Sequence, residues 1–112
     1  MNKKVYLSNA FSLSMLTENK QQYLIEVKEI TLEEVKTLLN DGFISAVGHE
    51  PTAQLLSEML GISVSPNRIA IKLEKGDSVI VFQLMQRLPE GKVLSKEEIL
   101  QLPHKWFRLT II

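Results

Sequence analysis

Short stretches of the chain alternate apolar and polar positions or are rich in β-branched residues, which is typical of β-strands. The run 23–30 ends in strict alternation, whereas 78–84 is apolar at most positions, as expected of a more fully buried strand. The predicted strands are 5–7, 23–30, 43–47, 68–73, 78–84 and 106–112.

Two longer runs carry apolar residues at helical spacing and therefore predict amphipathic helices. The first begins with a capping box at 31–34 and is expected to stop at Gly42. The second has Pro51 in the first helical position and is expected to stop at Gly61. A second capping box, at 95–98, predicts a shorter third helix that a proline ends.

The order of these elements predicts one domain over 1–112 with an α/β fold. The strands 68–73 and 78–84 are separated by a tight connection at 75–76, which predicts a β-hairpin, and a turn is expected at 88–91. Because a hairpin is antiparallel, we expect a mixed β-sheet flanked by helices.

Composition narrows the classes of ligand and compartment. Thirteen basic and thirteen acidic side chains cancel, so no global positive field favours long nucleic acid, and an anionic ligand must bind locally. The absence of cysteine removes disulfides, thiolate metal sites and thiol nucleophiles. The first residues lack an apolar segment behind them, and no apolar stretch is long enough to span a bilayer, so we expect a soluble, unprocessed protein.

Polar residues that can carry chemistry fall at predicted strand ends and loop starts, where binding sites are common. Each also has a structural explanation. Asn9 and Ser12 can be caps, Arg68 and Arg87 can be solvated strand ends, and Glu90 can be a turn residue. The polar groups are Asn9 with Ser12, Gly48 to Glu50, Asn67 with Arg68, and Gln83 to Glu90.

His49 directly precedes a predicted helix, where free backbone N–H groups and the helix dipole attract anions. The other histidine, His104, has no metal-ligand spacing to it, so no metal site is predicted. Ser12 can be a nucleophile with His49 as its base. No strand-turn-helix elbow surrounds Ser12, however, which favours a positioning role.

An acid-base histidine, two arginines and one or two carboxylates suit phosphodiester cleavage in RNA. The 2′-hydroxyl of RNA is an internal nucleophile, so this reaction requires no metal. The positive end of the helix dipole disfavours imidazolium, and a histidine that acts as an acid there needs a carboxylate partner. Glu90 is our candidate for this partner, with Glu50 as the nearer alternative.

The chain resembles a known family in several strings that occur in the same order. These strings are 5–12, 48–52, 67–68 and the stretch from Gln83 through 86–92, whose Gln-Arg-Leu-x-Glu-Gly-Lys portion is the most specific. They resemble the viral anti-CRISPR ring nucleases, proteins of archaeal viruses, phages and prophages that destroy the cyclic tetra-adenylate messenger of type III CRISPR defence. The resemblance covers roughly the whole chain.

The resemblance implies a role for each matching residue. His49 is the general acid, Arg87 and Ser12 hold or stabilise the reacting phosphate, and Glu90 supports the histidine. Pro89 stands where archaeal viral members can carry a carboxylate, which removes one alternative partner for His49. The residues implied in ligand binding are Asn9, Gly48, Arg68 and Gln83.

The resemblance also implies a mixed-sheet fold and a homodimer that takes the cyclic ligand across its two-fold axis. The expected products are linear di-adenylates ending in 2′,3′-cyclic phosphate, formed without metal or cofactor in the cytoplasm of a prokaryotic host. Two alternatives remain open at this point. One is a non-catalytic protein of the same fold, either a cyclic-oligonucleotide sponge or a small nucleic-acid-binding dimer. The other is an interaction module with no nucleotide ligand.

Overall fold

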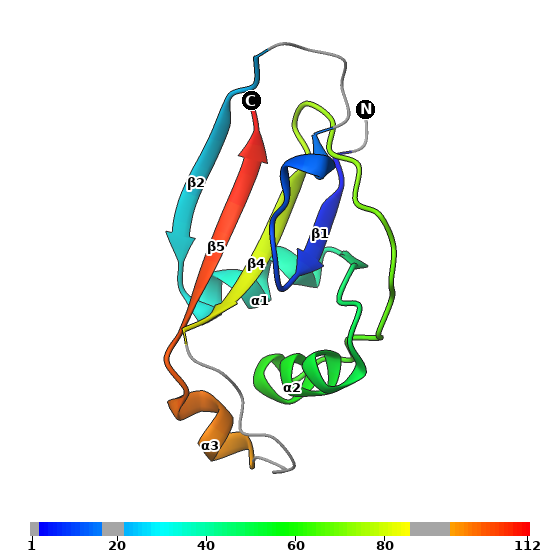
Figure 1. Cartoon of the computed structure of the whole chain (residues 1–112). Coiled ribbons are helices and arrows are strands. Elements are labelled where there is room, and N and C mark those ends of the chain that lie inside the picture. Colours follow the sequence, from blue (N-terminus) through cyan, green and yellow to red (C-terminus); the bar gives the residue numbers. More distant parts are fainter. Residues whose placement is uncertain (1–2, 17–21, 86–94) are drawn as a thin grey trace.

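The chain folds around a single β-sheet with helices on one side (Figure 1). The structure is a computed structural model that describes residues 3–16, 22–85 and 95–112. In these residues the sheet has five strands in the order β2-β5-β4-β1-β3. The strands are β1 (Val5–Ser8), β2 (Ile25–Ile30), β3 (Ile44–Ser45), β4 (Ser78–Leu84) and β5 (His104–Ile111).

The sheet is mixed, as the sequence predicts. On one side β1 lies between β3 and β4 and is parallel to both. On the other side β5 is antiparallel to β4 and to the edge strand β2. The helical elements are η1 (Leu13–Met15), α1 (Leu32–Asn40), α2 (Glu50–Leu60) and α3 (Lys96–Gln101).

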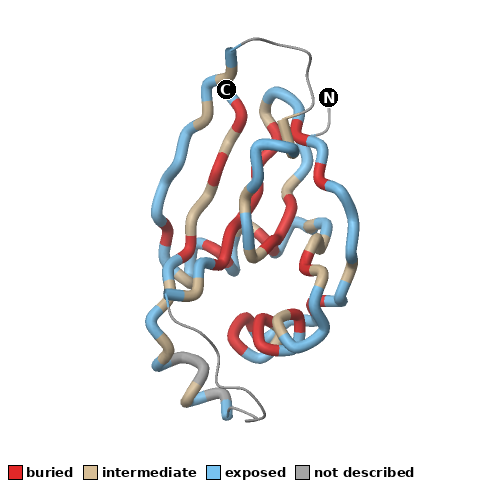
Figure 2. Tube along the Cα trace, viewed as in Figure 1, coloured by how far each residue is buried: buried red, intermediate tan, exposed pale blue. Residues whose placement is uncertain are grey.

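One face of the sheet packs against α1 and α2 and forms the larger core. Alternate residues of each strand point to this face, so Leu7, Ile80 and Phe82 are buried there together with helical side chains. Figure 2 shows buried segments along β4 and α2. The helical residues in this core are Val35 and Leu39 of α1, and Ala53, Leu55, Leu56, Met59 and Leu60 of α2.

The opposite face holds a second, smaller core. Tyr6, Val79 and Val81 are buried there, and the segment after β1 folds back over them with Phe11 packed against the cluster. In Figure 1 this segment crosses in front of β4 and β1. Both faces of the central strands are therefore covered, which explains the nearly continuous apolar run of β4.

The predicted helix caps are confirmed. Thr31 and Glu34 form a reciprocal capping box at α1, Ser95 and Glu98 exchange the same two bonds before α3, and Gly61 takes a left-handed φ of 70° at the end of α2. The prediction for Pro51 is off by one residue, because α2 begins at Glu50.

The predicted hairpin is wrong. Residues 68–72 form no strand, and Leu73 makes only an isolated parallel bridge to Leu16. The reason is non-local, because both neighbours of β4 in the sheet are already β1 and β5. The tight turn itself exists, with the Asp77 N–H donating to the Glu74 carbonyl oxygen at 2.9 Å. The turn predicted at 88–91 lies outside the described residues.

Candidate functional site

The three parallel strands end at one edge of the sheet, and polar residues gather in the segments that follow them. Strands β1, β3 and β4 are parallel to one another, so their carboxyl ends point the same way, toward α2 (Figure 1). Ligands of open α/β sheets commonly bind outside the carboxyl ends of the strands. We call this region the carboxyl edge, defined by Asn9, Gly48, His49, Arg68 and Gln83.

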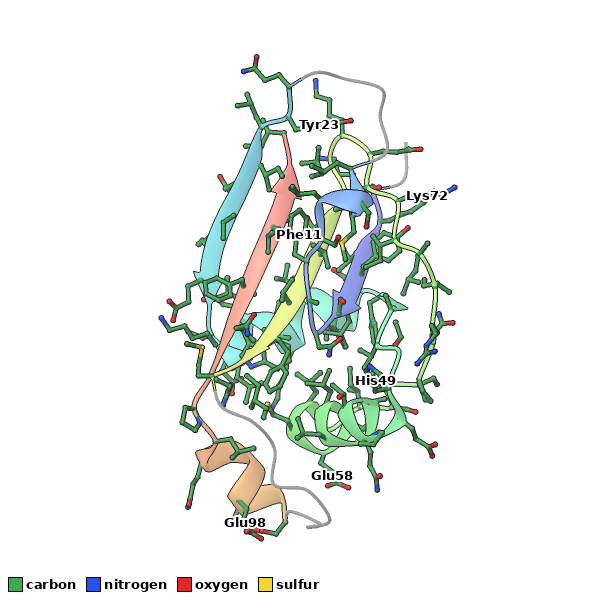
Figure 3. The ribbon with its side chains drawn as sticks, viewed as in Figure 1. Phe11, Tyr23, His49, Glu58, Lys72 and Glu98 are labelled. Atoms are coloured by element: carbon green, nitrogen blue, oxygen red, sulfur yellow. The ribbon has the colours of Figure 1, made fainter. Side chains whose placement is uncertain are left out.

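His49 is the residue at which the loop after β3 enters α2 (Figure 3). Its backbone is extended, with φ −118° and ψ 128°, and its carbonyl oxygen accepts the bond from Ala53 N–H at 3.0 Å. The side chain makes no capping hydrogen bond and is exposed. Within the described residues the imidazole is thus free to meet a ligand beside the unsatisfied N–H groups of the first helical turn.

Arg68 reaches this histidine loop from a distant part of the chain. A Cβ built on Gly48 would lie 3.6 Å from Arg68 Nε, which is ordinary van der Waals contact. The guanidinium-bearing side chain therefore lies over the backbone immediately before His49. The structure thus brings together Gly48, His49 and Arg68.

Asn67 and Ser45, for which the sequence predicts no specific role, hold the segment that carries Arg68 in place. Asn67 Nδ2 donates to the Ser45 carbonyl oxygen at 2.7 Å, and Asn67 N–H donates to the Val47 carbonyl oxygen at 2.8 Å. Ser45 Oγ in turn donates to the Ser65 carbonyl oxygen at 2.6 Å. The segment carrying Arg68 is thereby tied to the loop after β3. The only sequence signal was an asparagine beside an arginine.

Asn9 and Gln83 lie at the ends of the neighbouring strands. Asn9 directly follows β1 and is half-buried. Gln83 is exposed near the end of β4, opposite Lys105 in register, and its Nε2 donates to the Leu84 carbonyl oxygen at 3.1 Å. Both residues occupy the carboxyl edge.

Ser12 does not lie at the carboxyl edge. Its Oγ accepts the N–H of Ser14 at 3.3 Å as the cap of η1. This turn is anchored where Met15 accepts the N–H of Leu73, toward the amino-terminal end of β1 (Figure 1). The structure therefore does not bring Ser12 to His49 within one copy of the chain.

Arg87 and Glu90 lie outside the described residues, so their predicted roles stay predictions. Glu50, the alternative carboxylate, is the first residue of α2 and is exposed. Within the described part of the chain, His49 makes no ion pair with Glu50.

In the residues that the structure describes, no three His, Cys, Asp or Glu side chains are grouped so that they could hold a metal ion. Among the same residues, no helix has the length and apolar character needed to cross a membrane.

Comparison with known proteins finds one matching family and several similar proteins. The model of the STIV B116-like family matches residues 5–106. The chain is 42% identical to protein 26 of Sulfolobus islandicus filamentous virus over 98 residues, which cover 87% of this chain and 81% of that protein. It is 35% identical to YddF of Bacillus subtilis, covering 90% of this chain and 94% of YddF.

A solved structure has the same fold. B116 of Sulfolobus turreted icosahedral virus superposes with a TM-score of 0.82 at 33% identity, covering 96% of this chain and 98% of B116. Sequence and fold therefore agree, and the chain belongs to the STIV B116-like family.

Proposed function

We propose that this protein is a metal-independent ring nuclease that cleaves cyclic tetra-adenylate and thereby antagonises type III CRISPR signalling. The observation that carries the proposal is the exposed His49 residue at the amino end of α2, directly after Gly48, over whose backbone the Arg68 side chain lies. This arrangement combines a proton donor, a cation and helix N–H groups at one edge. Relatives in viruses of archaea are consistent with a role against a host defence.

The proposed reaction is transesterification within the RNA backbone. The ribose 2′-oxygen forms a bond to phosphorus, the bond from phosphorus to the 5′-oxygen breaks, and His49 gives its proton to the departing 5′-oxygen. The 2′-hydroxyl loses its proton to solvent. Two such events in one ring give linear di-adenylates ending in 2′,3′-cyclic phosphate.

The remaining roles come from the family resemblance. Arg87 and Ser12 hold or stabilise the reacting phosphate, Glu90 supports His49, and Asn9 and Gln83 contact the ligand. Arg68 has the guanidinium geometry that suits two phosphate oxygens at once. Because Ser12 and His49 do not meet within one copy, we propose a homodimer in which the ring lies across the two-fold axis.

The direct experiment incubates the protein with cyclic tetra-adenylate in excess chelator and follows the products by chromatography. We expect cleavage to persist in chelator and to fall about 10²–10⁴-fold in His49→Ala, the usual range for removal of a general acid. His104→Gln is the matched control, since His104 lies at the start of β5 with its Nδ1 2.6 Å from the Leu102 carbonyl oxygen.

Other results of this experiment would support one of the alternative functions or contradict the proposed role of His49. Tight binding of an intact ring supports the sponge, and an absence of binding supports an interaction module. Cleavage that His49→Ala leaves unchanged contradicts the proposed acid.

A further inference from the structure

A buried carboxylate lies at the end of the sheet opposite the carboxyl edge. Asp77 directly precedes β4 and is 3% exposed, and among the described residues no other aspartate or glutamate is buried. Burying an ionised carboxylate is costly unless hydrogen bonds replace its hydration. The proposed function does not use Asp77, so the burial of this carboxylate has to be explained by its own contacts.

Both carboxylate oxygens of Asp77 accept backbone N–H groups. Oδ1 accepts the N–H of Lys4 at 3.0 Å, and Oδ2 accepts the N–H of Glu74 at 3.0 Å. Lys4 directly precedes β1, and its carbonyl oxygen accepts the N–H of Ser78 at 2.9 Å. Glu74 begins the tight turn that the Asp77 N–H closes. The carboxylate therefore fixes this turn against the start of β1, through hydrogen bonds of the stronger, charge-assisted kind.

The residue before this turn holds the helical turn η1 (Figure 1). Leu73 N–H donates to the Met15 carbonyl oxygen at 2.8 Å, and Met15 N–H donates to the Ser12 carbonyl oxygen at 3.0 Å. Leu73 itself is buried in the second core, with Met15 packed against that cluster. Because apolar packing is non-directional, it holds η1 on the sheet without setting its orientation. The hydrogen bonds set that orientation, and Ser12 lies at their end.

We propose that Asp77 is a positioning residue for Ser12. The inference rests on the proposed function, in which Ser12 holds or stabilises the reacting phosphate. The Glu74 N–H belongs to the planar peptide group that joins Glu74 to Leu73, so the bond to Asp77 fixes the direction in which the chain leaves Leu73. Leu73 then holds η1, which carries Ser12. In this role Asp77 does not contact the ring and acts only through backbone hydrogen bonds.

A double-mutant cycle on cleavage tests the positioning role. Asp77→Asn keeps the shape of the side chain, but its Nδ2 cannot accept an N–H, so one of the two bonds is lost. Since a misplacement of about 1 Å can cost about 10²-fold in rate, we expect a loss of roughly tenfold in cleavage of saturating cyclic tetra-adenylate. In the Ser12→Ala background the same change should cost less than about twofold. Equal losses in the two backgrounds overturn the proposal.

Amide hydrogen exchange by NMR tests the link without any nucleotide. In the unmodified protein one opening of the turn frees the N–H groups of Lys4, Glu74 and Leu73, so we expect the three to be protected equally. Asp77→Asn should accelerate the exchange of all three in protein that remains folded. If Leu73 exchanges independently of the other two in the unmodified protein, the link is contradicted, and this result does not require that Asp77→Asn folds.

Thr110→Val is the matched control at the same end of the sheet. The Thr110 hydroxyl lies 3.1 Å from the Ser78 hydroxyl. Side chains alternate along β4, so this pair lies on the face opposite Val79 and the second core. Loss of this bond should leave cleavage and Leu73 exchange within about twofold of the unmodified protein. A loss of cleavage as large as that of Asp77→Asn would indicate general loosening of this end of the sheet and overturn the proposal.

The exchange experiment separates failure of this inference from failure of the proposed function. Absence of cleavage by the unmodified protein overturns the proposed function, and with it the catalytic purpose of the Asp77 contacts. The exchange pattern of Lys4, Glu74 and Leu73 still decides by itself whether Asp77 holds η1. Normal cleavage with independent exchange of Leu73 overturns the positioning role alone.

Discussion

The parallel and antiparallel halves of the sheet differ in what their ends expose. In the parallel half, β3, β1 and β4 have two, four and seven residues and run in the same direction, and the segment after β3 leads to His49 at the start of α2. In the antiparallel half, β5 and β2 are paired along six residues, and the exposed feature is the side of β2 rather than its end. The comparison places the candidate site at the ends of the parallel strands, whereas the antiparallel half exposes the side of its last strand.

The largest stability difference between the halves should appear on truncating equivalent apolar residues. Leu7→Ala empties a fully buried position in central β1, and we expect a loss of about 2–5 kcal/mol in the free energy of unfolding. Val27→Ala, on the exposed edge, should change it by less than about 0.5 kcal/mol. Urea denaturation measures both. Similar losses for the two variants would contradict the assigned burial.

Asn67→Ala should weaken the parallel half at the site itself. Removing the Nδ2 donor leaves the Ser45 carbonyl oxygen without this 2.7 Å bond, at a cost of about 1–3 kcal/mol in stability. Affinity for cyclic tetra-adenylate should also fall, because Arg68 is no longer fixed over Gly48. Asn40→Ala, at the exposed end of α1, is the matched control. Equal effects of the two changes on affinity would remove the positioning role of Asn67.

Local features of the fold could be predicted from the sequence, whereas contacts between distant segments could not. Capping boxes such as Thr31 with Glu34 are local, so their residues reveal them. The alternation at 68–73 correctly signals burial of Ile71 and Leu73, yet sequence cannot show that β1 occupies the place of a hairpin partner. The meeting of Arg68 with Gly48 rests on contacts twenty residues apart, for which the chain carries no local signal.

The candidate site likewise contains one residue whose position could be predicted from the sequence and one whose position could not. The amino end of α2 could be predicted at His49, because Pro51 and the apolar spacing are sequential features. The position of Ser12 could not be predicted, since it depends on Phe11 packing on the second core. The same packing turns the segment toward the amino-terminal end of β1.

Thr31→Ala should remove the capping box that joins β2 to α1. We expect a loss of about 1 kcal/mol, typical of an N-cap substitution, with no effect on nucleotide cleavage. Thermal unfolding measures the first quantity and product analysis the second. Thr37→Ala is the control, because Thr37 lies inside α1 and its hydroxyl bonds only the Glu33 carbonyl oxygen.

Gly48→Ala should have the smallest effect on stability among these variants. The added Cβ meets Arg68 at an ordinary contact distance of 3.6 Å, so unfolding should be unchanged within about 0.5 kcal/mol. If the ligand phosphate approaches this backbone, affinity for the ring should nevertheless fall. Unchanged affinity would place the phosphate away from Gly48.

The proton-donor role of His49 is the central claim, and a modified leaving group tests it most directly. In a cyclic tetra-adenylate whose bridging 5′-oxygens are replaced by sulfur, the leaving group departs without protonation. We predict that His49→Ala cleaves this substrate within a few-fold of the unmodified protein, although it fails on the natural ring. A defect as large on the sulfur substrate as on the natural one would contradict general-acid catalysis by His49.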